Sequence, residues 1–360
     1  MSLLSRYLIR NNLFLLLSIL LMGTGLYLLT DIFERLDSFL EAGVSAGTVA
    51  WFYLVKTPLI ISQILPAVFL IAVIVQFALM DKAREMVALQ SGGISPMKLL
   101  SVIIFYGLLW AGVQLAFSQV LGIQGDLISK RLWQEQVRGK ERKEVTLQGL
   151  WFTEASHVVH LGLAYPELGE GTDFLSYELS SDGNTLESTV SARKFVITDQ
   201  GWLLQDVVIM TPQNFGYTAL DEYRMNIKQD LSPFVALEPG ANPALLPVWD
   251  LGESIDRLIA TGSNVEGLRT AYHAKFAYSL SIVVLGVLGL AIVLWFRNLY
   301  MSVGIGLLAI FVLFAATILC NTMGTKGILP PIIAAWGTNV TLSVIALGAL
   351  AWKIKPRFGR

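Results

Sequence analysis

Six long apolar stretches, three towards each end of the chain, constrain most strongly what this sequence can fold into. A helix of about 20 residues crosses the ~30 Å hydrocarbon core of a membrane. None of the six stretches contains Asp, Glu, Lys or Arg, and one ionised side chain at membrane depth costs at least ~2.5 kcal/mol. The pattern predicts six membrane-spanning helices in two groups of three. The stretches cover roughly residues 13–30, 59–80, 99–121, 276–296, 302–320 and 332–352.

Charged residues are distributed unevenly around these stretches. Between Asp126 and Thr270 there are 12 Lys and Arg against 21 Asp and Glu. The segments on the other side of the predicted spans carry ten basic residues and only two acidic ones, Asp81 and Glu85. The positive-inside rule therefore predicts cytoplasmic termini and an exported 126–270 segment. The acidic balance of that segment argues against a nucleic-acid partner.

The exported segment has a strand-like pattern from about residue 145 to 230. Its short apolar runs are typical of a β-sandwich or jelly roll, and its flanks, 126–140 and 250–270, look helical. The one cysteine, Cys320, excludes an intrachain disulfide. The runs cover 145–152, 174–179, 194–197, 202–204, 207–210 and 223–227, with turn signals at 182–184, 199–201 and 212–214.

These patterns predict an α-helical membrane protein with six transmembrane helices, arranged 3+3, and an inserted periplasmic β-jellyroll domain. The predicted domains are residues 1–125 with spans one to three, 126–270 with the β-jellyroll and its helical connectors, and 271–360 with spans four to six. The first apolar stretch is a full span without a small-residue cleavage site, so we expect no cleavable signal peptide.

Motifs for catalysis or metal binding are missing from the sequence. It contains neither a G-x-x-x-x-G-K-[ST] phosphate-binding loop nor a G-x-S-x-G nucleophile elbow. His157 and His160 are three residues apart, so on a strand they would face opposite sides, which makes a poor metal site. We therefore expect no catalytic residue, no metal and no cofactor in this chain.

The loop between the second and third apolar stretches is the most informative short segment. Interpreted as a helix over about 82–92 that ends at Gly92 and Gly93, it is short and amphipathic, with Met86 and Val87 on one face and Leu89 towards another. One interpretation is a surface linker between two spans. The other is a coupling helix that docks in a groove of a cytoplasmic ATPase, with the Glu85 carboxylate available to pair with a basic residue of that partner.

Several segments along the chain resemble one known family. The chain resembles the lipopolysaccharide-export permeases, the LptF/LptG family, over essentially its whole length. The segments at 149–151 and 328–333 are closer to the LptG branch than to the LptF branch. The matching elements are Arg6-Tyr7-Leu8, Pro66 in the second span, the loop 84–95, Gln148-Gly149-Leu150-Trp151 and Gly327 to Ile333.

The resemblance implies a function and partners. Such a permease pairs with an LptF-like paralogue in the bacterial inner membrane, and an LptB-like ATPase dimer binds ATP and docks on the coupling helices. An LptC-like single-span protein passes lipopolysaccharide on to a periplasmic bridge. The family's coupling glutamate maps onto Glu85, and we assign ATPase coupling to Glu85 with Arg84, Met86 and Leu89.

Five basic residues near the outer interface are candidate contacts for the phosphates of lipopolysaccharide, because they are exceptions to the positive-inside rule. The resemblance favours Lys130 and Lys275 among them. The family can carry a basic residue where this chain has Asp31, which puts a phosphate contact at the first span in doubt. The alternative is that these cations snorkel or pair with Asp31, Glu34 and Asp126. The candidates are Arg35, Lys56, Lys130, Arg131 and Lys275.

Two other functions remain open on the sequence. The chain could be a permease for another lipid or a lipoprotein cargo, built on the same half-transporter plan. It could also be a membrane-anchored periplasmic ligand-binding receptor. A receptor would need a cytoplasmic signalling element, and the short tails leave no room for one.

Overall fold

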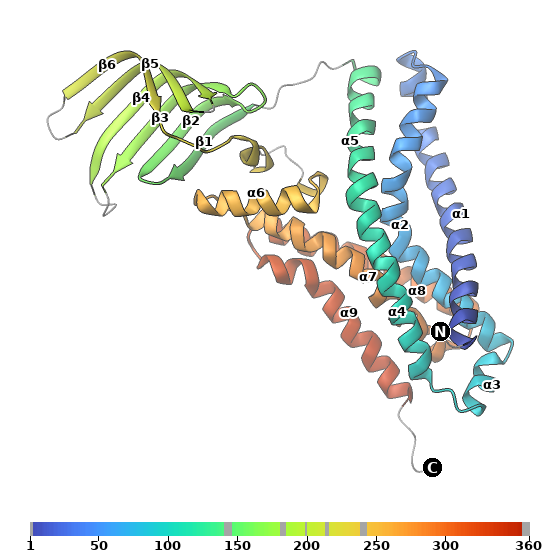
Figure 1. Ribbon diagram of the computed structural model, residues 1–360. Coiled ribbons are helices and arrows are strands. Elements are labelled where there is room, and N and C mark those ends of the chain that lie inside the picture. The colour runs from blue at the N-terminus through green and yellow to red at the C-terminus, as the bar shows by residue number, and fades with distance from the viewer. Residues whose placement is uncertain are drawn as a thin grey trace. The chain divides into compact units, whose positions relative to one another are not determined.

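The computed structural model describes residues 3–139, 146–180, 185–198, 200–212, 216–237 and 243–354 (Figure 1). The chain divides into two units. The helical unit comprises Met1–Lys140 and Arg269–Arg360, and the β unit comprises Glu141–Leu268. The first division thus falls at 140, whereas the sequence predicts a boundary at 125, because the helix that follows residue 122 packs on the second span.

Six helices in the described part of the chain are long and apolar enough to cross a membrane, which confirms the predicted count. Each extends beyond the apolar stretch that identified it, because polar residues continue a helix outside the hydrocarbon region. The six are α1 (Leu3–Glu41), α2 (Ala46–Lys82), the run from α4 to η2 (Pro96–Val137), α7 (Glu266–Phe296), α8 (Leu299–Thr325) and α9 (Pro331–Ile354).

The third span continues without a break into the predicted helical connector. Its α-helical parts are α4 (Pro96–Phe117) and α5 (Ile123–Leu132), and each is followed by one π-helical turn, η1 (Ser118–Gly122) and η2 (Trp133–Val137). Such π-helical turns are rare inside α-helices, and those that occur are often found at functional sites. The loop between the second and third spans holds one short helix, α3 (Glu85–Ser91), which is shorter than the predicted 82–92.

Helix α2 runs through the core of the helical unit. Phe69, Leu70 and Ile74 on α2 are fully buried. Gly286 on α7 allows a close approach, because an added Cβ would lie 2.6 Å from the Phe69 ring. The most apolar windows of α1 and α8 are only 11% buried each. These two helices therefore offer apolar surface to lipid or to other subunits.

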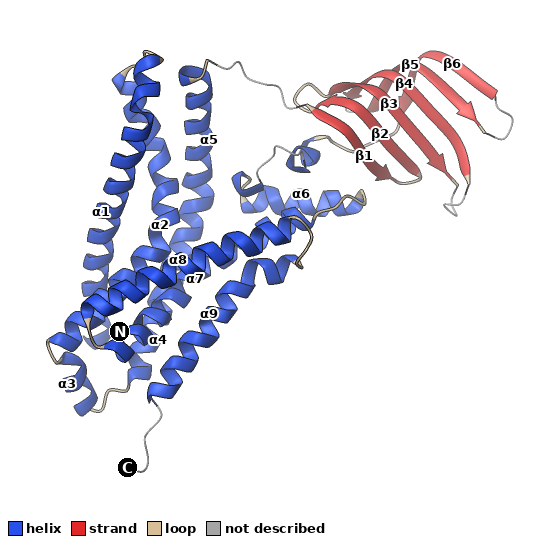
Figure 2. Ribbon diagram, turned by 180° about the vertical axis from the view of Figure 1, so that it is seen from behind, coloured by secondary structure: helices blue, strands red, loops and turns tan. Residues whose placement is uncertain are grey.

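The β unit contains one six-stranded antiparallel sheet in which strands pair in chain order (Figure 2). The inserted β domain is thus confirmed, and its described strands follow a neighbour-to-neighbour order that is simpler than the two-sheet jelly roll we expected. The predicted turns at 182–184, 199–201 and 212–214 fall wholly or partly outside the described residues. The strands are β1 (Leu147–Glu154), β2 (His157–Tyr165), β3 (Glu170–Leu179), β4 (Leu186–Thr198), β5 (Gly201–Thr211) and β6 (Gly216–Met225).

A line of residues without a ladder partner crosses all six strands. The register of each strand pair is the same directly before and directly after this line, and the β3–β4 register shifts only at the end of β3, between Glu178 and Leu179. Gly149, Asp173 and Asp206 on this line have positive φ angles of 62°, 57° and 54°, a left-handed conformation that Gly and Asp tolerate best. We call this line the crease. It consists of Gly149, Gly162, Asp173, Arg193, Asp206 and Asp221.

The crease changes the alternation of buried side chains along β2, β3, β4 and β5. Successive buried positions are normally two residues apart in a strand, but across the crease they are three apart. One face of these strands therefore stays buried on both sides of the crease. Examples are Gly171 and Phe174 on β3, Ala192 and Phe195 on β4, and Leu204 and Val207 on β5.

Aromatic side chains fill the buried face of the sheet. Trp202 is fully buried and stacks on Phe195 with ring centroids 5.0 Å apart. The segment after β6 contributes Phe234, whose ring lies 5.3 Å from that of Phe152 on β1. The described part of the unit also contains the helices η3 (Ser232–Leu237), η4 (Pro243–Leu245) and α6 (Val248–Ala260).

Candidate functional site

The α3 helix is held by a tight turn on each side. Arg84, which precedes it, has a positive φ of 59°, and Gly93, which follows it, has one of 78°. The next helix begins with Ser95, whose Oγ accepts a hydrogen bond from the Met97 N–H at 3.1 Å. These turns place Glu85 at the first position of α3.

One face of α3 is anchored in the core of the helical unit. Met86 is 3% exposed and Leu89 packs against the same core, whereas Val87 is half exposed. The helix therefore buries Met86 and Leu89 together, because they are three residues apart. We had expected Met86 and Val87 to share a face and Leu89 to lie on another. Arg84, Val87, Ala88 and Gln90 are exposed residues of this segment, and Glu85 is partly exposed.

Glu85 contacts the first span. The Tyr7 hydroxyl donates a hydrogen bond to Glu85 Oε2 at 3.0 Å, and Tyr7 itself packs against the core. Both residues line a groove of ≈570 Å³ between α1 and α2, together with Arg10, Asn11 and Phe14. The carboxylate is thus half-buried, fixed by one neutral donor and adjacent to open space.

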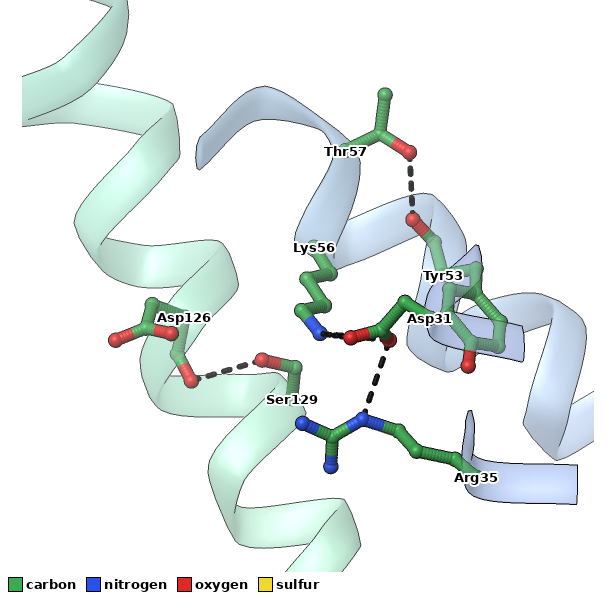
Figure 3. A network of polar contacts seen from close by, with 7 residues as sticks. All are labelled: Asp31, Arg35, Tyr53, Lys56, Thr57, Asp126 and Ser129. Atoms are coloured by element: carbon green, nitrogen blue, oxygen red, sulfur yellow. Dashed lines mark hydrogen bonds and ion pairs between the residues drawn. The ribbon is translucent and has the colours of Figure 1, made fainter. Parts of the chain in front are cut away.

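Two of the basic candidates, Arg35 and Lys56, gather around Asp31 at the other end of α1 (Figure 3). The Lys56 ammonium lies 2.9 and 2.8 Å from the two carboxylate oxygens of Asp31. The Arg35 Nε lies 3.2 Å from Asp31 Oδ2. The side chains of Asp31 and Lys56 are 9% and 12% exposed. Because this pair is almost fully removed from water, its partners depend strongly on each other.

Aromatic rings surround this ion cluster. The Arg35 guanidinium lies 4.5 Å from the centre of the Trp133 ring, and the Lys56 ammonium lies 5.4 Å from that of Phe52. Phe39 contacts Phe52 and Trp133 edge to face, at 5.5 and 5.3 Å between centroids. The cluster therefore joins the ends of α1, α2 and η2 through charges and rings.

The other basic candidates lie on α5 and α7. Lys130 pairs with Asp126 on its own helix at 2.8 Å, and its side chain is 50% exposed. Arg131 is exposed, and Lys275 on α7 is half-buried. Helix α5 reaches the cluster because Gly125 lies against α2, where an added Cβ would come within 1.9 Å of the Val55 carbonyl oxygen. The cation pairings with Asp31 and Asp126 match the alternative derived from the sequence.

The contacts of two residues in the site were not predicted from the sequence. Tyr7 lies in the matching segment before the first span, but nothing in the sequence pairs it with Glu85. Trp133 follows Asp126 by seven residues, so the two share a helix face, and this spacing could have identified it. His157 and His160 lie on β2, with His157 opposite Glu154 and His160 opposite Trp151.

Comparison with known families identifies the chain. The family described as lipopolysaccharide export system permease LptF/LptG matches residues 6–353, which includes both units. The match does not distinguish the LptF and LptG branches. A comparison with curated proteins found no match.

Proposed function

Because the chain belongs to the LptF/LptG family of lipopolysaccharide export permeases, we propose that it extracts lipopolysaccharide from the bacterial inner membrane and passes it to a periplasmic bridge. It is a multi-pass membrane protein of six apolar helices. In this proposal it pairs with an LptF-like paralogue and an LptC-like single-span protein. The match over 6–353 carries the proposal, and the segments at 149–151 and 328–333 support an LptG-like role.

A separate LptB-like ATPase dimer supplies the energy in this proposal. The arrangement of α3 supports this, because Met86 and Leu89 fix the helix to the core while Glu85 borders an open groove. A basic residue of the ATPase would pair with Glu85, and Arg84 would flank the contact. Met86 and Leu89 would then transmit the movement into the spans as anchors.

The orientation follows from the charge distribution. We place α3 and both termini in the cytoplasm and the β unit in the periplasm, as the positive-inside rule requires. A reporter that is active only in the periplasm should work when it is inserted in the β unit and fail when it is inserted after Gly92. The opposite pattern would contradict the whole arrangement.

The basic candidates differ in how easily they could bind a phosphate. Lys56 and Arg35 share Asp31 in a nearly dry cluster, so a phosphate would have to displace a carboxylate from Lys56. The Lys130 side chain is half exposed, although its partner Asp126 is 10% exposed, so the Lys130 ammonium can reach a phosphate without being buried itself. We therefore propose that Lys130, with Arg131 and Lys275, contacts substrate, while Lys56 and Arg35 hold the helices together.

Copurification tests the substrate. The chain should be purified from native membranes with its partners, and the bound protein and lipid should be identified by mass spectrometry. The proposal predicts lipopolysaccharide, an ATPase and a paralogous permease. Recovery of only another lipid or a lipoprotein would point to a different cargo.

Photo-crosslinking tests the contacts. A crosslinker at position 130 or 275 should label lipopolysaccharide in an ATP-dependent manner, and the same group at position 56 should label it much less. Equal labelling at all three positions would contradict the assignment of roles.

A further inference from the structure

The hydroxyl of Tyr7 on α1 donates a hydrogen bond to the Glu85 carboxylate at 3.0 Å. We propose that Tyr7 is a positioning residue for coupling: it orients the Glu85 carboxylate for the ATPase and makes α1 follow the movement of α3. This inference rests on the proposed function, because it concerns how the coupling helix acts.

The contact joins elements that are not neighbours in the chain. Short turns connect α3 to α2 and α4, so those helices are coupled to it covalently. Helix α1 has no such connection, and Tyr7 and Glu85 are 78 residues apart. The hydrogen bond therefore adds a third helix to those that α3 can move.

The chemistry of the donor suits a carboxylate that must also bind a partner. A tyrosine hydroxyl is a neutral donor, so it orients Glu85 without cancelling its charge. It occupies one of the carboxylate's several lone-pair positions and leaves others for a basic side chain that enters the groove. By contrast, Lys56 contacts both oxygens of Asp31 and neutralises it.

Helix α1 can carry the movement over a long distance. It is one continuous helix from Leu3 to Glu41. At a rise of 1.5 Å per residue, Tyr7 and Asp31 lie about 36 Å apart along it. Its far end is tied to α2 by Lys56 and to η2 by the Arg35 and Trp133 contact. A shift of α3 that moves Tyr7 would therefore reach the ion cluster.

The substitution Tyr7→Phe tests the inference because it keeps the partly buried ring and removes only the hydroxyl. In the reconstituted complex, we expect about five- to tenfold less lipopolysaccharide released per ATP hydrolysed, the size of a lost hydrogen bond to a charged group near the surface. The matched control is Tyr27→Phe, on the same helix, which should leave this ratio unchanged. Thermal unfolding of each purified variant shows whether the fold is intact.

A double-mutant cycle distinguishes a positioning role from a general structural one. In a Glu85→Ala background, Tyr7→Phe should cause no further loss, because its acceptor is already gone. A wild-type ratio for Tyr7→Phe, or a loss that adds fully to that of Glu85→Ala, would overturn the inference. A different result is expected if the proposed coupling role of Glu85 is wrong. In that case the Glu85→Lys variant assembles with the ATPase and releases substrate normally.

Discussion

Asp31 and Glu85 are two carboxylates in contact with other helices, and their surroundings differ in kind. Lys56 binds both oxygens of Asp31, Arg35 binds one of them, and the side chain is 9% exposed. Glu85 accepts one hydrogen bond from Tyr7 and borders a groove of ≈570 Å³. A carboxylate that is neutralised and dry holds structure, whereas one that is oriented but still charged and accessible can bind a partner.

The largest expected effect of this difference is on stability. Asp31→Ala leaves Lys56 nearly buried without its partner and should lower the free energy of unfolding by about 3 kcal/mol. Glu85→Ala removes one hydrogen bond near the surface and should cost about 1 kcal/mol or less. Thermal unfolding of the two purified variants in the same detergent measures the difference. Equal losses would remove the distinction between the two sites.

A second prediction sharpens the assignment of Asp31 to structure. Lys56→Met should cost about 2 kcal/mol, because Arg35 still partly compensates Asp31. The double variant Asp31→Asn with Lys56→Met removes both charges and should be less destabilised than the sum of the single variants. Unfolding curves of the three variants give the interaction energy. Simple additivity would mean that the two charges do not depend on each other.

The smallest expected effect is at Lys130. The Lys130 side chain is half exposed, although its partner Asp126 is 10% exposed, and the pair is spaced i, i+4 on one helix. Lys130→Met should therefore change stability by less than about 1 kcal/mol. Lipopolysaccharide release by the same variant should fall measurably, since the ammonium serves substrate in our account. A large stability loss with unchanged release would mean that Lys130 stabilises the fold, which is the role we assign to Lys56, and does not bind substrate.

The spans were predictable from the sequence because charge-free apolar runs are costly to place anywhere but in lipid or a core. Their full lengths were not, since the ends of α1 and of the run to Val137 are polar and have no hydropathy signal. The ion cluster was partly predictable, because Asp31 is expected near the same outer interface as the basic candidates Arg35 and Lys56. The Tyr7 contact was not, as it joins residues 78 apart through a turn whose geometry depends on Arg84.

The predicted apolar runs cover only parts of the strands, and the crease explains where several of these runs begin or end. A period of two residues identifies strands, but buried positions shift by one at the crease. The predicted runs 174–179, 194–197 and 223–227 accordingly begin just beyond crease residues. The runs 202–204 and 207–210 are the two halves of β5, which Asp206 separates. No predicted run covers β2, which has Gly162 at this position.

The measurement that tests the central claim most directly is lipopolysaccharide release by the reconstituted complex with Glu85→Lys, beside Glu85→Ala and the unchanged chain. Reversal places like charges together at the ATPase contact, so release should fall more than about tenfold and further than with alanine. ATPase binding and ATP turnover, measured in parallel, show whether assembly or coupling is lost. Normal assembly and normal release by Glu85→Lys would contradict the coupling role and leave α3 a surface linker between two spans.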